Sequence, residues 1–447
     1  MVSKKFFCLE MVRRVCANLG VERSTKRYLS LLFFLTLFLP KGINAAGYYF
    51  PPPGQTLSQQ NQQTPQTVNL SGNIITDLSG KATRWALWRH GYLVHVSGDF
   101  NQTSEVKSLR KTWHALTVGA AVNQGKIPDF KTQKISFYQT NLTGKDKDAT
   151  WWHVITQSAG FDYPGCGDSI DYAPGQMWTY SDLNLKNLNE ALFKAWGSPG
   201  GSYTASNYKT VLNQAYFSAI GMQGWNTQLN TDGIRLVLDL EDMGRLGLLM
   251  LARGRWNNTV LVPQWFVEEQ ETKKTAGMLV NYDGCNDGVI SFLTKATFPE
   301  SPYGYLTWTN SAGDFYKNAS TSWAWGAGAG GTYILWNQKN GVVFAGVGVD
   351  DSPKTSGGIP HIIEANITGS NPLFEGGPSI LPTKTPTPIV SGKPGDANGD
   401  GKVDGLDYVV WLNHYNQSAT GAGSGDFNNS GKVDGLDYVI WLNNYNK

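Results

Sequence analysis

Two copies of an acidic twelve-residue loop near the C-terminal end constrain the fold of this chain more than any other feature. They occupy residues 396–407 and 426–437. In both copies, side chains with oxygen atoms stand at loop positions 1, 3, 5, 9 and 12, and a glycine stands at position 6. This is the ligand pattern of an EF-hand-like calcium loop, in which position 7 contributes its backbone carbonyl. An acidic surface turn would not repeat with every ligand position kept, so the pattern predicts two structural calcium sites.

Each loop leads into an apolar helix, at residues 408–412 and 438–442, which predicts a small all-α calcium-binding domain. The expected ligands of the two ions are Asp396, Asn398, Asp400, Lys402 (through its carbonyl), Asp404 and Asp407 in the first loop, and Asp426, Asn428, Ser430, Lys432 (through its carbonyl), Asp434 and Asp437 in the second.

A mostly apolar stretch at residues 108–124 predicts a buried helix that ends at a glycine. Two overlapping Ser-x-x-Lys pairs stand at its start, Ser104 with Lys107 and Ser108 with Lys111. Residues three apart share a helical face, and a buried lysine that loses its charge can take the hydroxyl proton of the serine. We favour the second pair because Ser108 lies where the apolar helix opens. The alternative is a capping serine with a solvated lysine.

Two further elements carry candidate residues. Tyr180 follows a proline-glycine turn and precedes a helical leucine pattern, where it would relay protons or, alternatively, pack on the core as a turn aromatic. Residues 323–336 form a glycine-rich entry into an apolar strand, and a second strand at 341–349 follows. Such a strand would present a backbone amide to an oxyanion. The alternative is a strand that packs tightly because its glycines have no side chains.

Residues 1–45 predict a cleaved signal peptide with a basic start, a short apolar run and a small-residue cleavage site. The apolar run is too short to span a bilayer, so we expect a secreted protein without a membrane span. The leader holds eight Lys and Arg against two Glu, and its removal changes the formal net charge from +2 to −4. The mature chain therefore lacks the basic signature of a nucleic-acid-binding protein.

Composition divides the chain into a signal peptide (1–45), a Pro/Gln-rich linker (46–69), a globular segment (70–376), a Pro/Thr linker (377–394) and the repeated loops (395–447). The globular segment exceeds the size of a single core, so two lobes with a cleft are expected. Cys166 and Cys285 remain after cleavage; they predict one disulfide, and two buried free thiols stay the open alternative.

The order of motifs in the globular segment resembles the serine beta-lactamase-related family, which includes class C beta-lactamases, D-Ala-D-Ala peptidases, family VIII esterases and oligoamide hydrolases. Ser108-Leu-Arg-Lys111 is followed by Gln157-Ser-Ala-Gly, by Tyr180-Ser-Asp and by Pro302-Tyr-Gly-Tyr-Leu-Thr-Trp before the glycine-rich strand. The resemblance implies an α/β two-lobe serine hydrolase with a central antiparallel sheet and a helical lobe.

Matching positions imply the roles of individual residues. Ser108 would be acylated, Lys111 would be its base and Tyr180 would assist proton transfer, with no cofactor for catalysis. The backbone amides of Ser108 and Ala329 would form the oxyanion hole. The resemblance therefore implies a small-molecule ester or amide as the substrate.

Two positions depart from the family pattern. Asp182 stands where the Tyr-x-Asn box has asparagine, and Gly326-Ala-Gly328 stands where the family has Lys/His-Thr-Gly. All three would lie in the substrate cleft. The missing cation normally holds a substrate carboxylate, so its absence favours an ester or linear amide over a beta-lactam or D-Ala-D-Ala peptide. A non-catalytic binding module and an accessory esterase in polysaccharide catabolism remain alternatives.

The repeated loops resemble a type I dockerin, a calcium-folded plug that docks into a cohesin domain. The resemblance covers residues 395–447 and implies attachment to a scaffold or surface through a cohesin. Dockerins commonly carry hydroxyl residues at loop positions 10 and 11, whereas this chain has Gly405-Leu406 and Gly435-Leu436. Position 12 is aspartate rather than glutamate, and we still expect it to bind calcium.

Overall fold

The computed structural model describes residues 48–51, 62–161, 172–281, 300–351, 358–369, 393–397, 401–415, 417, 421–428 and 430–446. The chain divides into two compact units, Met1–Glu375 and Gly376–Lys447. The predicted signal peptide, the predicted Cys166–Cys285 disulfide and the loop ligands Asn398 and Asp400 lie outside the described residues.

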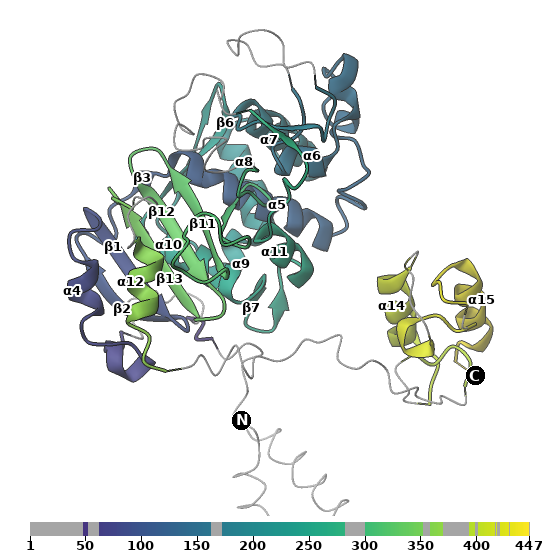
Figure 1. The fold of residues 1–447 in the computed structure, drawn as a ribbon. Helices are drawn as coiled ribbons and strands as arrows, with labels where there is room; N and C mark the ends of the chain where they lie inside the picture. The colour runs from purple at the N-terminus through teal and green to yellow at the C-terminus, as the bar shows by residue number, and fades with distance from the viewer. Residues whose placement is uncertain are drawn as a thin grey trace, which may run out of the picture. The chain divides into compact units, whose positions relative to one another are not determined.

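A six-stranded antiparallel sheet forms the centre of the first unit (Figure 1). In spatial order its strands are β10 (Trp308–Thr309), β11 (Trp323–Gly328), β12 (Thr332–Asn337), β13 (Val342–Val347), β1 (Arg84–Arg89) and β2 (Tyr92–Ser97). β1 pairs with β2 on one side and with β13, one of the predicted glycine-rich strands, on the other, where Leu87 pairs with Phe344. All residues of β1 are buried, because elements pack on both faces of the sheet.

Helices cover the sheet on two sides. α4 (Ile74–Leu78) and α12 (Ile359–Ala365) lie together on the face turned to the viewer, and α10 (Leu240–Leu251) lies behind the sheet (Figure 1). Two glycines let α10 approach closely, because a Cβ at Gly244 would stand 2.5 Å from the Trp88 ring. A Cβ at Gly247 would stand 2.4 Å from Val343. The strand pattern and these small residues together fix the packing of α10.

The remaining elements of the first unit are mostly helical. They are η1 (Pro65–Val68), η2 (Lys107–Leu109), α5 (Arg110–Asn123), η3 (Ile135–Phe137), η4 (Gly144–Asp148), α6 (Trp151–Ile155), α7 (Leu183–Ala195), α8 (Ala205–Leu212), η5 (Asn213–Phe217), α9 (Ser218–Ile220) and α11 (Gln264–Gln270). Short strands complete it: β3 (Ser104–Glu105), β5 (Asn226–Asn230) and β6 (Gly233–Leu238) form one sheet, β4 (Met177–Trp178) pairs with β9 (Leu279–Val280), and β7 (Arg255–Trp256) pairs with β8 (Thr259–Val260).

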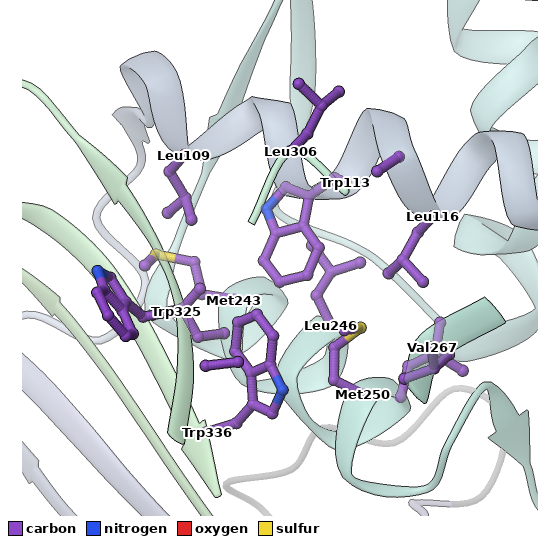
Figure 2. Packing of buried hydrophobic residues seen from close by; sticks show 14 of the residues in the cluster. Leu109, Trp113, Leu116, Met243, Leu246, Met250, Val267, Leu306, Trp325 and Trp336 are labelled. Carbon is purple, nitrogen blue, oxygen red and sulfur yellow. The ribbon is translucent and has the colours of Figure 1, made fainter. Parts of the chain in front are cut away.

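α5 lies between the sheet and the helical part and is buried along most of its length. Its Trp113 points toward Trp336 of the sheet, with 6.4 Å between the ring centroids. Leu246 and Met250 of α10 complete this part of the core (Figure 2). The predicted buried helix is therefore present, and the two predicted lobes are parts of one compact unit that share this core.

The second unit contains α14 (Gly405–His414), η6 (Ala422–Ser424) and α15 (Gly435–Asn444). The two repeats are joined by matching contacts. Trp411 donates its indole N–H to the carbonyl of Asp434, and Trp441 donates to the carbonyl of Asp404, both at 2.9 Å. Each helix thus braces the loop of the other repeat. Among the helices in the described ranges of both units, none is long and apolar enough to cross a membrane.

A buried pair of carboxyls at the start of α10 predicts a pH-dependent stability. Burial, and then the neighbouring Asp239, raise the pKa of Asp242 to about 7. Between pH 4 and 7 the folded chain keeps a proton here that the unfolded chain loses. Stability is therefore lost as the pH rises, by about 1.4 kcal/mol per pH unit. Thermal unfolding in saturating calcium from pH 5 to 8 measures this loss.

Asp242→Asn is the control for this prediction, because a neutral amide removes the titration and leaves Asp239 as the helix cap. The variant is expected to lose less stability than the natural chain between pH 5 and 8. An equal loss of stability with pH in the two proteins would contradict the assignment of this loss to Asp242.

Candidate active site and calcium loops

Ser108 lies on a tight turn between β3 and α5. The 3-10 helix η2 carries it, and the residue before it, Lys107, has a φ of 51°. Such left-handed backbone is uncommon for a residue with a side chain and persists only where the surroundings hold it. Val106 and Leu109 on either side are fully buried and anchor the turn. The turn therefore presents Ser108 from a rigid support.

Lys111 donates a hydrogen bond from Nζ to Ser108 Oγ at 3.1 Å, and its side chain is 1 % exposed. The overlapping pair is not joined in this way. Lys107 pairs with Glu105 at 2.6 Å, and Ser104 accepts a hydrogen bond from an arginine. Of the two sequence motifs, only Ser108 and Lys111 are hydrogen-bonded to each other, and their roles as nucleophile and base stay a prediction.

Asp182 lies directly against Lys111. Nζ of Lys111 donates a hydrogen bond to Asp182 Oδ1, and the guanidinium of Arg110 lies 3.6 Å from the same oxygen. Burial alone would raise the pKa of Asp182, but the charges of Lys111 and Arg110 outweigh it and hold this pKa below its usual value. The sequence placed Asp182 in the substrate cleft and missed its contact with the lysine. The acid in place of the family's asparagine was the available signal.

Tyr180 meets Lys111 with the face of its ring. Lys111 Nζ lies 4.3 Å from the ring centroid, which is a cation–π contact. The ring stacks on Trp308, with 6.0 Å between centroids, and is 2 % exposed. Across the described ranges, no hydrogen bond joins the Tyr180 hydroxyl to Ser108 or Lys111. Tyr180 is therefore a packed aromatic in this structure, and its role as a proton relay stays a prediction.

Gln157 holds the segment that carries Tyr180 and Asp182, and sequence reasoning did not single it out for this role. Its carbonyl accepts a hydrogen bond from the Thr179 amide at 2.9 Å. Its side-chain Oε1 accepts one from the Ser181 amide at 2.7 Å. The backbone of Gln157 is left-handed, with φ of 60°. The residues on both sides of Tyr180 are thus fixed by one glutamine.

Two glycines let β11 approach the turn that carries Ser108. A Cβ at Gly326 would stand 2.3 Å from Leu109 and 2.8 Å from the hydroxyl of Thr112. A Cβ at Gly328 would stand 2.2 Å from the carbonyl of Val106. A side chain at Gly328 would require a backbone shift, and one at Gly326 would require the side chains of Leu109 and Thr112 to move. The space beside Gly326 is therefore occupied by these two side chains.

Ala329 is exposed in the turn that follows β11. Its neighbour Gly328 lies close to the carbonyl of Val106, so the end of β11 lies beside the turn that carries Ser108. The oxyanion hole formed by the amides of Ser108 and Ala329 remains a prediction.

Gly328→Ala is expected to lower hydrolysis by Ser108 at least about tenfold and to cost about 1–3 kcal/mol of stability. The added methyl group must push against the Val106 carbonyl and shift the turn that holds Ser108. Activity toward an ester and the unfolding temperature, measured on one preparation, test both effects. Ala327→Ser, one position along the strand on its opposite face, is the control and should retain activity.

The calcium loops have the backbone that their ligand pattern demands. Glycines at loop position 6, Gly401 and Gly431, adopt φ of 83° and 84°. Their amides donate to the first carboxylates of the loops, Asp396 and Asp426, both at 2.9 Å. A residue with a side chain would be strained at this turn, so glycine is required there.

The last ligand of each loop closes it. Asp407 accepts hydrogen bonds from the amides of Ala397 and Asp404, both at 2.8 Å. Asp437 accepts from Asn428 and Asp434 in the same way, at 3.1 and 2.9 Å. The carboxylates at loop positions 1 and 12 are buried. These donor sets fit calcium, which prefers carboxylate, amide and carbonyl oxygens.

Within the described ranges, no group of three or more His, Cys, Asp or Glu side chains has metal-binding geometry. The expected sets also use Asn, Ser and backbone oxygens, together with Asp400, which lies outside the described residues. The assignment of the complete ligand sets therefore stays a prediction.

Comparison with known proteins gives one family match. Residues 394–445 match the model of the dockerin type I domain. No curated protein matches the chain. The prediction of a C-terminal type I dockerin is confirmed.

Three solved structures illustrate what this chain is similar to. A beta-lactamase from Mycobacterium bovis is 16% identical, with a TM-score of 0.47, over 65% of this chain and 97% of its own. A penicillin-binding protein homologue from Pyrococcus abyssi is 13% identical, with a TM-score of 0.46, over 68% and 78%. EstCE1, described as a hydrolase with promiscuous acyltransferase activity, is 11% identical, with a TM-score of 0.47, over 68% and 97%. The predicted fold class agrees with the sheet and helices of the first unit.

Proposed function

We propose that residues 70–376 form a secreted serine hydrolase that cleaves an ester or a linear amide through an acyl-enzyme on Ser108. The observation that carries this proposal is the 3.1 Å contact between Lys111 Nζ and Ser108 Oγ at the buried start of α5. A serine beside a buried amine can become a nucleophile at moderate pH. The dockerin would attach this hydrolase to a cohesin-bearing scaffold or surface outside the cell, with calcium bound in its loops.

The proposed reaction has two halves. The amine of Lys111 takes the hydroxyl proton while Ser108 Oγ bonds to the acyl carbon, and the amides of Ser108 and Ala329 stabilise the oxyanion. The proton then passes to the leaving alcohol or amine, with Tyr180 assisting, and the bond to the leaving group breaks. Water hydrolyses the acyl-enzyme, releases the acid and returns the proton to Ser108. The reaction requires no cofactor.

Close packing at Gly326 supports an ester or a linear amide over a beta-lactam. A cationic side chain at position 326 would collide with Leu109, whose Cδ1 lies 2.3 Å from the position of a Cβ.

Turnover of a short-chain nitrophenyl ester and of a chromogenic cephalosporin by the full chain tests this proposal. We expect ester cleavage, little cephalosporin turnover, and labelling of one serine by a fluorophosphonate. Equal turnover of both substrates would contradict the argument from Gly326. A folded protein with neither turnover nor labelling would favour a non-catalytic binding module.

A further inference from the structure

We propose that Asp182 is a positioning residue that holds Lys111 as an ammonium against Ser108 in the resting enzyme. This inference rests on the proposed function, in which Lys111 is the base of Ser108.

The surroundings of Lys111 favour its charged form. The side chain is 1 % exposed, and a buried ammonium is costly unless an anion pairs with it. Asp182 supplies that anion through a direct hydrogen bond. The face of the Tyr180 ring lies on another side, 4.3 Å from Nζ, and also attracts a cation. Ser108 Oγ completes the contacts, at a distance that a proton transfer requires.

Asp182 is itself fixed by a chain of charged groups that alternate in sign and end on both sides of Ser108. In order they are Lys107, Glu105, Arg235, Asp232, Arg110, Asp182 and Lys111. Each carboxylate in the chain lies between two cations. Burial acts to raise the pKa of all three carboxyls, but the cations hold each pKa below its usual value. The chain therefore stays ionised well below neutral pH.

The other titratable groups near Lys111 do not replace Asp182. His114, one turn along α5, is fully buried, and burial with the charge of Arg110 lowers its pKa to about 3, so it is neutral. Burial raises the pKa of Tyr303 well above its usual value, so this phenol is neutral as well. Asp232 lies beyond Arg110 and contacts that residue instead. Asp182 is the carboxylate that meets the lysine.

The charge state has a direct chemical consequence. An ammonium cannot accept the proton of Ser108, so Lys111 must first give its proton to water or hydroxide. The amine that results then takes the hydroxyl proton as Oγ attacks. Hydrolysis should therefore rise with pH, and Asp182 sets where it rises.

The test follows the Lys111 amine itself, so that it does not depend on turnover. The full chain is labelled with [13Cε]lysine, and its lysine signals are followed by NMR as the pH rises. The Lys111 signal is the one absent from a Lys111→Arg protein. We expect Asp182→Asn to lower the titration midpoint of this signal by at least about one pH unit, because the adjacent anion is lost.

Asp232→Asn is the matched control, because it removes the same charge one step further along the chain. It is expected to move the Lys111 midpoint by less than a third as much. No shift in Asp182→Asn, or equal shifts in the two variants, would overturn the proposal. If Asp182→Asn fails to fold, Asp182→Glu restores a carboxylate and should keep the natural midpoint; a large fall in that variant would also overturn it.

The pH profile of ester hydrolysis gives a second reading. The rising limb should move to lower pH in Asp182→Asn together with the NMR midpoint. A protein that shows the NMR shift without any ester hydrolysis would retain this inference about Asp182 and refute the proposed function.

Discussion

Ser108→Ala is expected to lower ester hydrolysis by a factor on the order of 10⁴ and to abolish fluorophosphonate labelling. Loss of Oγ removes the atom that is proposed to form the acyl-enzyme, and Lys111 and Asp182 remain paired with each other. The unfolding temperature should change little, because the hydroxyl has one hydrogen-bond partner in the described structure. Steady-state kinetics and intact-mass measurement after labelling give both results.

Ser104→Ala is the control, because Ser104 begins the overlapping Ser-x-x-Lys motif. Its hydroxyl accepts a hydrogen bond from Arg84 at 2.6 Å and has no contact with Lys111. We expect hydrolysis within a few-fold of the natural chain and full labelling. Loss of labelling in Ser104→Ala with labelling kept in Ser108→Ala would show that the choice between the two motifs is wrong.

The sequence predicts the elements of the site well because their signals are local. An apolar run that ends in a glycine predicts α5, and glycines alternating along an apolar strand predict β11. The calcium loops are predicted position by position, because every ligand lies within twelve residues. In each case the backbone of a short segment fixes the feature.

The contacts of Lys111 could not be predicted in the same way. Asp182 lies 71 residues further along the chain, and only tertiary packing brings its carboxylate to the amine. The two hydrogen bonds that Gln157 accepts from the Tyr180 segment depend on the left-handed backbone of Gln157, which no residue pattern predicts. Leu109 occupies the space beside Gly326 because β11 approaches η2 closely, and the sequence does not show how close two such elements come. These features are set by packing between distant segments.

Removal of calcium with a chelator is expected to unfold residues 393–446 and to leave the first unit folded. Without the ion, the buried carboxylates of Asp396, Asp407, Asp426 and Asp437 would lose the cation that their loops are expected to hold, which is unfavourable. The buried indoles of the two helices would become exposed. A red shift of tryptophan fluorescence reversed by calcium, loss of cohesin binding and unchanged ester hydrolysis are the expected results.

The number of ions follows from variants of single loops. Calorimetry should give two calcium ions for the natural chain and one for Asp426→Ala, because loop position 1 of the second repeat loses its carboxylate. Lys432→Ala should still bind two, since its side chain is exposed and only its carbonyl is expected to bind the ion. Each loop also receives the indole of the opposite helix, at Asp404 and Asp434, so the loss of one ion should weaken binding at the other. Two ions bound to Asp426→Ala, or a second unit that stays folded in the chelator, would contradict the assignment of these loops.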